Sequence, residues 1–174
     1  MQFRLEDAIS ILSRTPATVD TLVRGLPESW LHANEGPETW SPFDVVGHLV
    51  AGERTDWVPR LRMILEHGDA RAFEPFNRVA MFEESKGKSI GELLDTFATL
   101  RAQNLETVHA LQLEPKDMTR PGKHPSLGAV TLEQLLATWV THDMTHLAQI
   151  SRVIAKQFTD EVGPWREYIG VLNR

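Results

Sequence analysis

The chain contains no cysteine among its 174 residues. Disulfide bonds, thiolate metal sites and a cysteine nucleophile are therefore excluded. Any thiol chemistry would have to use a thiol supplied by another molecule.

Long apolar runs and basic blocks are also missing. No apolar stretch approaches the ~20 residues that a membrane-spanning helix requires, and the first seven residues, MQFRLED, already carry charges. The formal net charge is −6, with no Lys/Arg cluster that could follow a phosphate backbone. We expect a cytoplasmic protein with no membrane or nucleic-acid partner.

The remaining composition is that of an ordinary globular protein. Hydrophobic residues make up 41% and charged residues 24% of the chain, close to the averages for soluble proteins. The length suits one domain with its own hydrophobic core. We expect a single domain over residues 1–174.

Apolar residues recur at three- and four-residue intervals along most of the chain, which favours helices over strands. Four long helices are expected, at about residues 3–25, 41–67, 89–111 and 131–157. The tail after residue 157 should hold a loop and a short final helix. Residues 112–130 contain three prolines and two glycines and are expected to form a loop, with no strand pattern. The expected fold class is all-α, a four-helix bundle.

Local signals refine the helix ends. Pro16 should split the first helix, with Thr15 capping the restarted part, and Pro59 should bend the second. Ser41 should be the N-cap of the second helix, with Pro42 at its first position and Asp44 at its third. Capping boxes are expected at the starts of the last two helices, formed by Ser89 with Glu92 and by Thr131 with Gln134.

The stretch WVTHDMTHLAQI, residues 139–150, places two histidines on the apolar face of the last helix. His142 and His146 are four residues apart, so their rings lie one turn apart on the same side. A lone core histidine is usually satisfied by a hydrogen bond. Two stacked imidazoles favour a divalent metal ion, which accepts both as neutral ligands at ~2.0–2.1 Å.

A catalytic metal usually has at least three protein ligands. The other histidines are His32, His48, His67, His109 and His124. We favour His48, which lies in DVVGHLVAGE on the second helix, where small neighbours leave room for an ion. Periodicity alone does not aim this ring at the site.

Two competing metal patterns are rejected. Glu106-x-x-His109 is the spacing of di-iron bundles, but only one copy exists and Glu106 falls opposite the apolar stripe. The HDMTH stretch differs from the zinc-protease signature because Asp143 is one methylene shorter than glutamate and no downstream ligand has the metzincin spacing.

Four stretches carry a family resemblance: RTPATVDTLVRGLPESW, WSPFDVVGHLVAGERTDW, HPSLGAVTLEQLLATWVTHDMTHLAQISRVIA and EVGPWREYIGVL. Through them the chain resembles the DinB family, also called the DinB/YfiT-like metalloenzymes, over nearly its whole length. The resemblance implies an up-down-down-up bundle that holds one divalent metal, often zinc or nickel, through His48, His142 and His146. Known members include thiol S-transferases and a thiol-dependent isomerase, and several are homodimers.

The leading hypothesis is a mononuclear metal-dependent enzyme, a thiol-dependent S-transferase or a hydrolase, acting on a small-molecule substrate. Zinc or nickel would activate a bound water or a low-molecular-weight thiol co-substrate. Asp143 is the candidate catalytic residue, as a proton acceptor or as a group that orients a ligand imidazole. The alternative is a non-catalytic metal-binding or stress-associated protein whose ion locks the bundle.

Other polar residues have open roles. Gln149 could hydrogen-bond a ligand or substrate, or only flank the helix. Glu53 could face the cation, or it could extend to solvent or lie at an interface. His124 could overhang the pocket mouth or remain a solvated loop residue. Three tryptophans could line the pocket or belong to the core: Trp40, Trp57 and Trp139.

Overall fold

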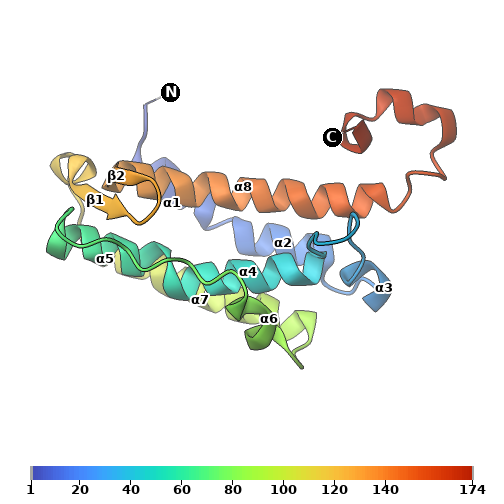
Figure 1. Ribbon diagram of the computed structural model, residues 1–174, viewed down its shortest axis with the longest axis horizontal. Helices are drawn as coiled ribbons and strands as arrows, with labels where there is room; N and C mark the ends of the chain where they lie inside the picture. Colours follow the sequence, from blue (N-terminus) through green and yellow to red (C-terminus); the bar gives the residue numbers. More distant parts are fainter. Residues whose placement is uncertain (1, 174) are drawn as a thin grey trace.

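Four long helical segments form the body of the protein (Figure 1). The computed structural model describes residues 2–173. The first segment comprises α1 (Leu5–Leu12) and α2 (Thr15–Val23), and the second comprises α4 (Pro42–Thr55) and α5 (Trp57–His67). The third and fourth are α7 (Ile90–Ala110) and α8 (Leu132–Lys156).

The chain direction follows the expected order (Figure 1). The first segment and α8 run one way along the bundle, and the second segment and α7 run the other way. The fold class is therefore confirmed as an all-α, up-down-down-up four-helix bundle. No helix within residues 2–173 is long and apolar enough to cross a membrane.

Short elements connect and extend these segments. They are α3 (Glu28–Leu31), α6 (Ala80–Ser85), and the 3₁₀ helices η1 (Pro115–Thr119), η2 (Gly163–Tyr168) and η3 (Gly170–Asn173). The last two form the tail after α8, close to the expected loop and short helix (Figure 1).

The two expected capping boxes are confirmed, and the expected N-cap Ser41 forms a third box with Asp44. At the starts of α4, α7 and α8 the hydroxyl accepts the backbone N–H three residues later, and that residue's side chain accepts the N-cap N–H. Two orphan donors are satisfied at each helix start. The pairs are Ser41 with Asp44, Ser89 with Glu92, and Thr131 with Gln134.

The expected cap at Thr15 is wrong. Thr15 is the first residue of α2, its N-cap is Arg14, and no side-chain cap bond forms. The Thr15 hydroxyl is instead buried and lacks a hydrogen-bond partner within residues 2–173. Because only two residues separate α1 from α2, Arg14 stays in the helical region of φ and ψ, and Thr15 is drawn into the helix.

The second segment breaks at Asp56 rather than bending at Pro59. Asp56 ends α4 and precedes α5, and Pro59 is the third residue of α5. Proline lacks the N–H that would reach the carbonyl of Thr55 in a continuous helix. A break at Asp56 places Pro59 in a first turn, where that donor has no helical partner anyway.

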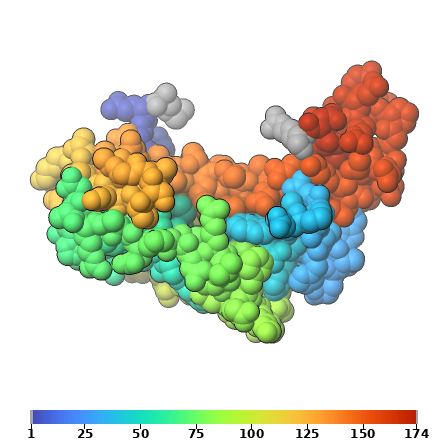
Figure 2. Space-filling view, in the orientation of Figure 1, coloured from blue at the N-terminus to red at the C-terminus, as the bar shows by residue number. Residues whose placement is uncertain are grey.

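A β-hairpin lies where only a loop was expected. Strands β1 (Pro121–His124) and β2 (Gly128–Thr131) pair antiparallel, with Pro121 opposite Thr131. Each strand has four residues, of which two are exposed, and no apolar alternation marks either strand in the sequence. The backbone N–H of Phe73 bonds the Lys123 carbonyl at 2.9 Å, which ties the hairpin to the α5–α6 connection beside it (Figure 2).

Two apolar clusters form the core. One gathers around α1, α5 and the start of α8, and includes Trp57 and Trp139. The other gathers around α2, α4 and the first half of α7, and includes Phe97 and Ile150. On α8 the histidine pair lies between Trp139 and Ile150, so the candidate site falls between the two clusters.

Gly122 fixes the hairpin against α5. A Cβ at this position would lie 2.7 Å from Ile64 Cγ1 and 3.1 Å from Phe73 Cζ. We predict that Gly122→Ala lowers the free energy of unfolding by about 1–3 kcal/mol, because a packed core resists an added methyl group. Urea denaturation measures the change. Gly170→Ala is the control, because nothing lies within 4 Å of its added Cβ; equal stability of the two variants would contradict this packing.

Candidate metal centre

Three histidine rings from two helices meet at one point in the bundle. His48 comes from α4, and His142 and His146 come from α8. Nε2 of His142 lies 2.9 Å from Nε2 of His48 and 3.2 Å from Nε2 of His146. His48 and His142 are 94 residues apart in the sequence, yet the fold brings their ring nitrogens and that of His146 together.

Hydrogen bonds between the rings cannot satisfy all of these close nitrogen contacts. An imidazole Nε2 either carries one proton or offers one lone pair. Nε2 of His142 has two close nitrogen neighbours, so one hydrogen bond can satisfy only one of these contacts. On a tetrahedral zinc ion with ~2.0–2.1 Å bonds, two ligand nitrogens lie about 3.3 Å apart. The donor set and its spacing therefore fit a divalent cation.

Burial keeps all three rings neutral near pH 7. Burial, helped by His146 and Arg78, lowers the pKa of His48 to about 3. Burial, helped by the two neighbouring rings, lowers the pKa of His142 to about 2. Burial also lowers the pKa of His146, while its bond to Gln149 opposes the shift. Neutral imidazole is the form that binds a metal.

Gln149 orients one of the rings. Its Oε1 lies 2.8 Å from Nδ1 of His146. An amide oxygen can only accept, so the proton stays on Nδ1 and the lone pair stays on Nε2. Nδ1 of His48 and of His142 is buried and has no hydrogen-bond partner in the part of the chain that the structure describes.

The rings form part of the wall of a pocket of about 500 Å³. Trp40 and Trp57 line it, whereas Trp139 is buried behind and stacks on Trp57 with ring centroids 5.6 Å apart. His124 also lines the pocket, so the β-hairpin does contribute to its wall. The other residues around it are Asp56, Arg60, Pro75, Phe76, Arg78, Pro125, Ser126 and Thr138.

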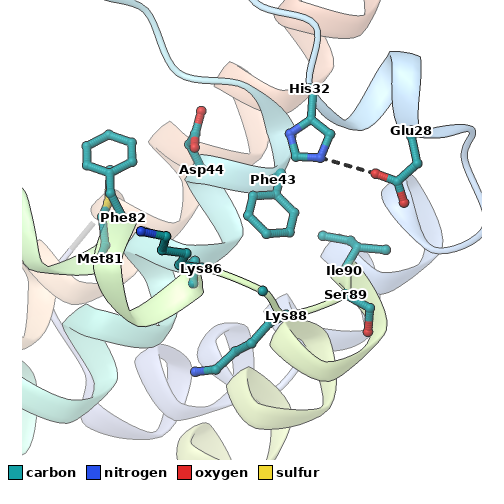
Figure 3. Close-up of a pocket in the computed structure, with 12 residues that line it drawn as sticks. Glu28, His32, Phe43, Asp44, Met81, Phe82, Lys86, Lys88, Ser89 and Ile90 are labelled. Atoms are coloured by element: carbon teal, nitrogen blue, oxygen red, sulfur yellow. Dashed lines mark hydrogen bonds and ion pairs between the residues drawn. The ribbon is translucent and has the colours of Figure 1, made fainter.

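The other candidate histidines lie elsewhere. His32 pairs with Glu28 at 3.1 Å in a separate pocket of about 330 Å³ beside Lys86 and Lys88 (Figure 3). His67 ends α5, and His109 is exposed near the end of α7. Among residues 2–173, only His48, His142 and His146 form a group with metal-ligand spacing.

A sequence model of the DinB superfamily matches residues 11–150, which include the three histidines. The chain belongs to the DinB superfamily. Comparison with curated proteins returns no match. Among solved structures, YfiT from Bacillus subtilis matches with a TM-score of 0.75 and 21% identity over 94% of each chain. It is described as a probable metal-dependent hydrolase with an unusual four-helix bundle topology. At this identity the likeness establishes the fold.

Beside its histidines, this DinB-superfamily chain buries a charged network. Arg101, on α7, binds Asp143 through two hydrogen bonds of 2.7 and 3.0 Å and Glu53 through one of 2.8 Å. Its guanidinium also donates to the carbonyl of Leu12 at the end of α1. One side chain therefore joins all four helical segments.

This network binds Asp143 and Glu53, the two carboxylates whose roles the sequence did not decide. Asp143 is fully buried, both of its oxygens bind Arg101, and it does not line the pocket. Glu53 is buried too, so it does not extend to solvent; it also accepts from Asn104 and Trp139. These contacts argue against Asp143 as a proton acceptor.

Arg101 was missed at the sequence level. It lies four residues after Phe97 on the apolar stripe of the third helix, where a charged residue needs a buried partner. That position is the signal that could have identified it.

We predict that Arg101→Met lowers the free energy of unfolding by about 3–5 kcal/mol, because two buried carboxylates lose their counter-charge. Urea denaturation measures the loss. Arg54→Met is the control, since its ion pair with Glu84 is 38% and 40% exposed and should contribute about 1 kcal/mol or less. Similar losses in both variants would contradict the claim that the buried network contributes more to stability than an exposed ion pair does.

The neutral histidines also predict an acid-sensitive metal-free protein. Unfolded histidine binds a proton below about pH 6.5, whereas folded His48 does not until about pH 3. Between pH 6.5 and 4.5 the unfolded state thus binds more protons, and stability falls on acidification by on the order of 1 kcal/mol per pH unit for each such histidine. Glu35, whose pKa Arg152 lowers to about 2, loses its contribution only below that window.

Urea denaturation in a chelating buffer at pH 7, 6 and 5 tests this pH dependence. His48→Gln should show a smaller slope than the wild type, because one depressed histidine has been removed. Identical slopes would contradict the assignment.

Proposed function

We propose that the protein is a metal-dependent enzyme that binds one divalent ion, zinc or nickel, through His48, His142 and His146. The observation that carries this proposal is that these rings line an open pocket. No Asp or Glu within residues 2–173 joins the three nitrogens as a fourth ligand. A structural site is usually closed by four protein ligands, whereas a catalytic site leaves a position open.

When bound, such an ion would lower the pKa of a coordinated water or thiol enough to give a nucleophile near neutral pH. The reaction we propose is hydrolysis, or transfer to a low-molecular-weight thiol, since the chain supplies no thiol of its own. The description of YfiT as a probable metal-dependent hydrolase supports the first of these two.

The chain's own residues would prepare the pocket for this chemistry. Gln149 holds the proton of His146 on Nδ1. Trp40 packs beside His48 with ring centroids 4.8 Å apart, and Trp57 packs edge-on to His142 at 5.0 Å. These indoles exclude water from the sides of the rings and strengthen electrostatic interactions there.

Asp143 has a supporting role in this proposal. Its carboxylate holds Arg101 and lies on the helix between the two ligand histidines. It therefore fixes the position of α8 and adds negative charge beside the ion, which stabilises the ion in its site. Proton transfer would then fall to groups that line or enter the pocket, not to Asp143.

Metal analysis tests the site. Purified wild-type protein should carry about one zinc or nickel ion per chain, and His142→Ala should carry almost none, because two nitrogens seldom retain an ion through dialysis. Emission spectrometry after dialysis gives the ratio. His109→Ala, which removes an exposed histidine of α7, is the matched control; unchanged stoichiometry in His142→Ala would refute the site.

A turnover assay separates this proposal from a metal-binding protein without activity. The metal-loaded protein is incubated with low-molecular-weight thiols and electrophiles, and with a panel of esters and amides. Turnover that a chelator abolishes and added metal restores is expected. A full site with no metal-dependent turnover would favour the non-catalytic alternative.

A further inference from the structure

The wall of the metal pocket carries an unbalanced positive charge. Two arginines, Arg60 and Arg78, and one carboxylate, Asp56, line it. Arg60 pairs with Asp56 at 2.7 Å, and their side chains are only 11% and 14% exposed. With the histidines neutral, one guanidinium charge remains before any metal binds.

That charge belongs to Arg78. Its side chain is exposed, and it has no hydrogen bond or ion pair with another residue in the range 2–173. Its charge nevertheless reaches the ligand rings, since it contributes to the lowered pKa of His48. An arginine that lines a pocket without a protein partner is available to a ligand.

The surroundings of Arg78 favour an anion over a cation. The chain has a net charge of −6, so a pocket with a positive charge stands apart from the rest of the molecule. A divalent ion at the histidines would add to that charge and attract anions further. His124 adds no negative group: its Nδ1 accepts the backbone N–H of Ser126 and of Leu127, which leaves its proton on Nε2.

Apolar rings lie beside the metal ligands in the pocket that Arg78 also lines. Phe76 lies edge-on to His48 with ring centroids 5.3 Å apart, and Trp40 packs on the same ring. Phe76 and Arg78 both come from the connection between α5 and α6, which runs alongside these helices (Figure 1). A ligand that contacts both the histidines and Arg78 would have a polar group for each of them and could place an apolar part against these rings.

We propose that Arg78 determines substrate specificity by binding a carboxylate of the small molecule in the pocket. A carboxylate fits because a single planar guanidinium binds it through two parallel hydrogen bonds and one charge balances the other. The other end of that molecule, a thiol or the group to be attacked, lies at the histidines. This inference rests on the proposed function.

The test compares a thiol acid with its neutral amide. Cobalt-loaded protein is titrated with 3-mercaptopropionate or 3-mercaptopropionamide in a dilute, carboxylate-free buffer, and Kd is taken from the thiolate-to-cobalt absorption band. Wild-type protein should bind the acid about tenfold more tightly than the amide, the size expected for one charge-assisted contact. Arg78→Gln should bring the two Kd values together and leave the amide's Kd unchanged.

The matched control is Arg71→Gln. Arg71 lies in the same connection, is 62% exposed, faces Glu74 and does not line the pocket. It should keep the wild-type preference for the acid. A wild-type protein without this preference, or an Arg78→Gln variant that retains it, would overturn the proposal.

A second readout separates this inference from the proposed function. The same two compounds are titrated into metal-free protein and followed by tryptophan fluorescence, since Trp40 and Trp57 line the pocket. Suppose that the metal-free protein prefers the acid but the cobalt-loaded protein shows no thiolate-to-cobalt band. This result would refute thiol binding at the metal and leave the role of Arg78 supported. The absence of a preference in both assays would refute the role of Arg78.

Discussion

The buried contact between Arg101 and its two carboxylates is the constraint on which the site depends. An unpaired charge in this position would cost several kcal/mol, so the helices must keep the register that joins Arg101 to Asp143 and Glu53. Glu53 follows His48 on α4, and Asp143 lies between His142 and His146 on α8. The register that satisfies Arg101 is thus also the register that brings the histidines together.

The buried network of Arg101, Asp143 and Glu53 lies between the two apolar clusters. It gives the two sides of the histidine site opposite charges. On one side, two carboxylates and one guanidinium leave a net negative charge beside the histidines. On the other side, the pocket wall carries the positive charge of Arg78. A cation at the histidines would be stabilised from within the bundle, while an anionic ligand would be attracted to the pocket.

Much of the fold could be predicted because it depends on local signals. Capping boxes at Ser41, Ser89 and Thr131 depend on residues three apart, so they mark helix starts without tertiary information. The errors fall where local signals compete or are weak. Thr15 had cap chemistry but lay too close to the preceding helix, and the hairpin was missed because its short strands carry no apolar alternation.

The sequence by itself determined the helical segments, the absence of a protein thiol and the one-turn spacing of His142 and His146, since all of these follow from composition or from neighbours on one helix. Only the tertiary structure decided that His48 meets that pair, because its place on the helical wheel did not aim it there. It also decided that Asp143 faces Arg101 and not the pocket. Such contacts depend on how separate helices are packed and rotated, and no periodicity within one helix encodes them.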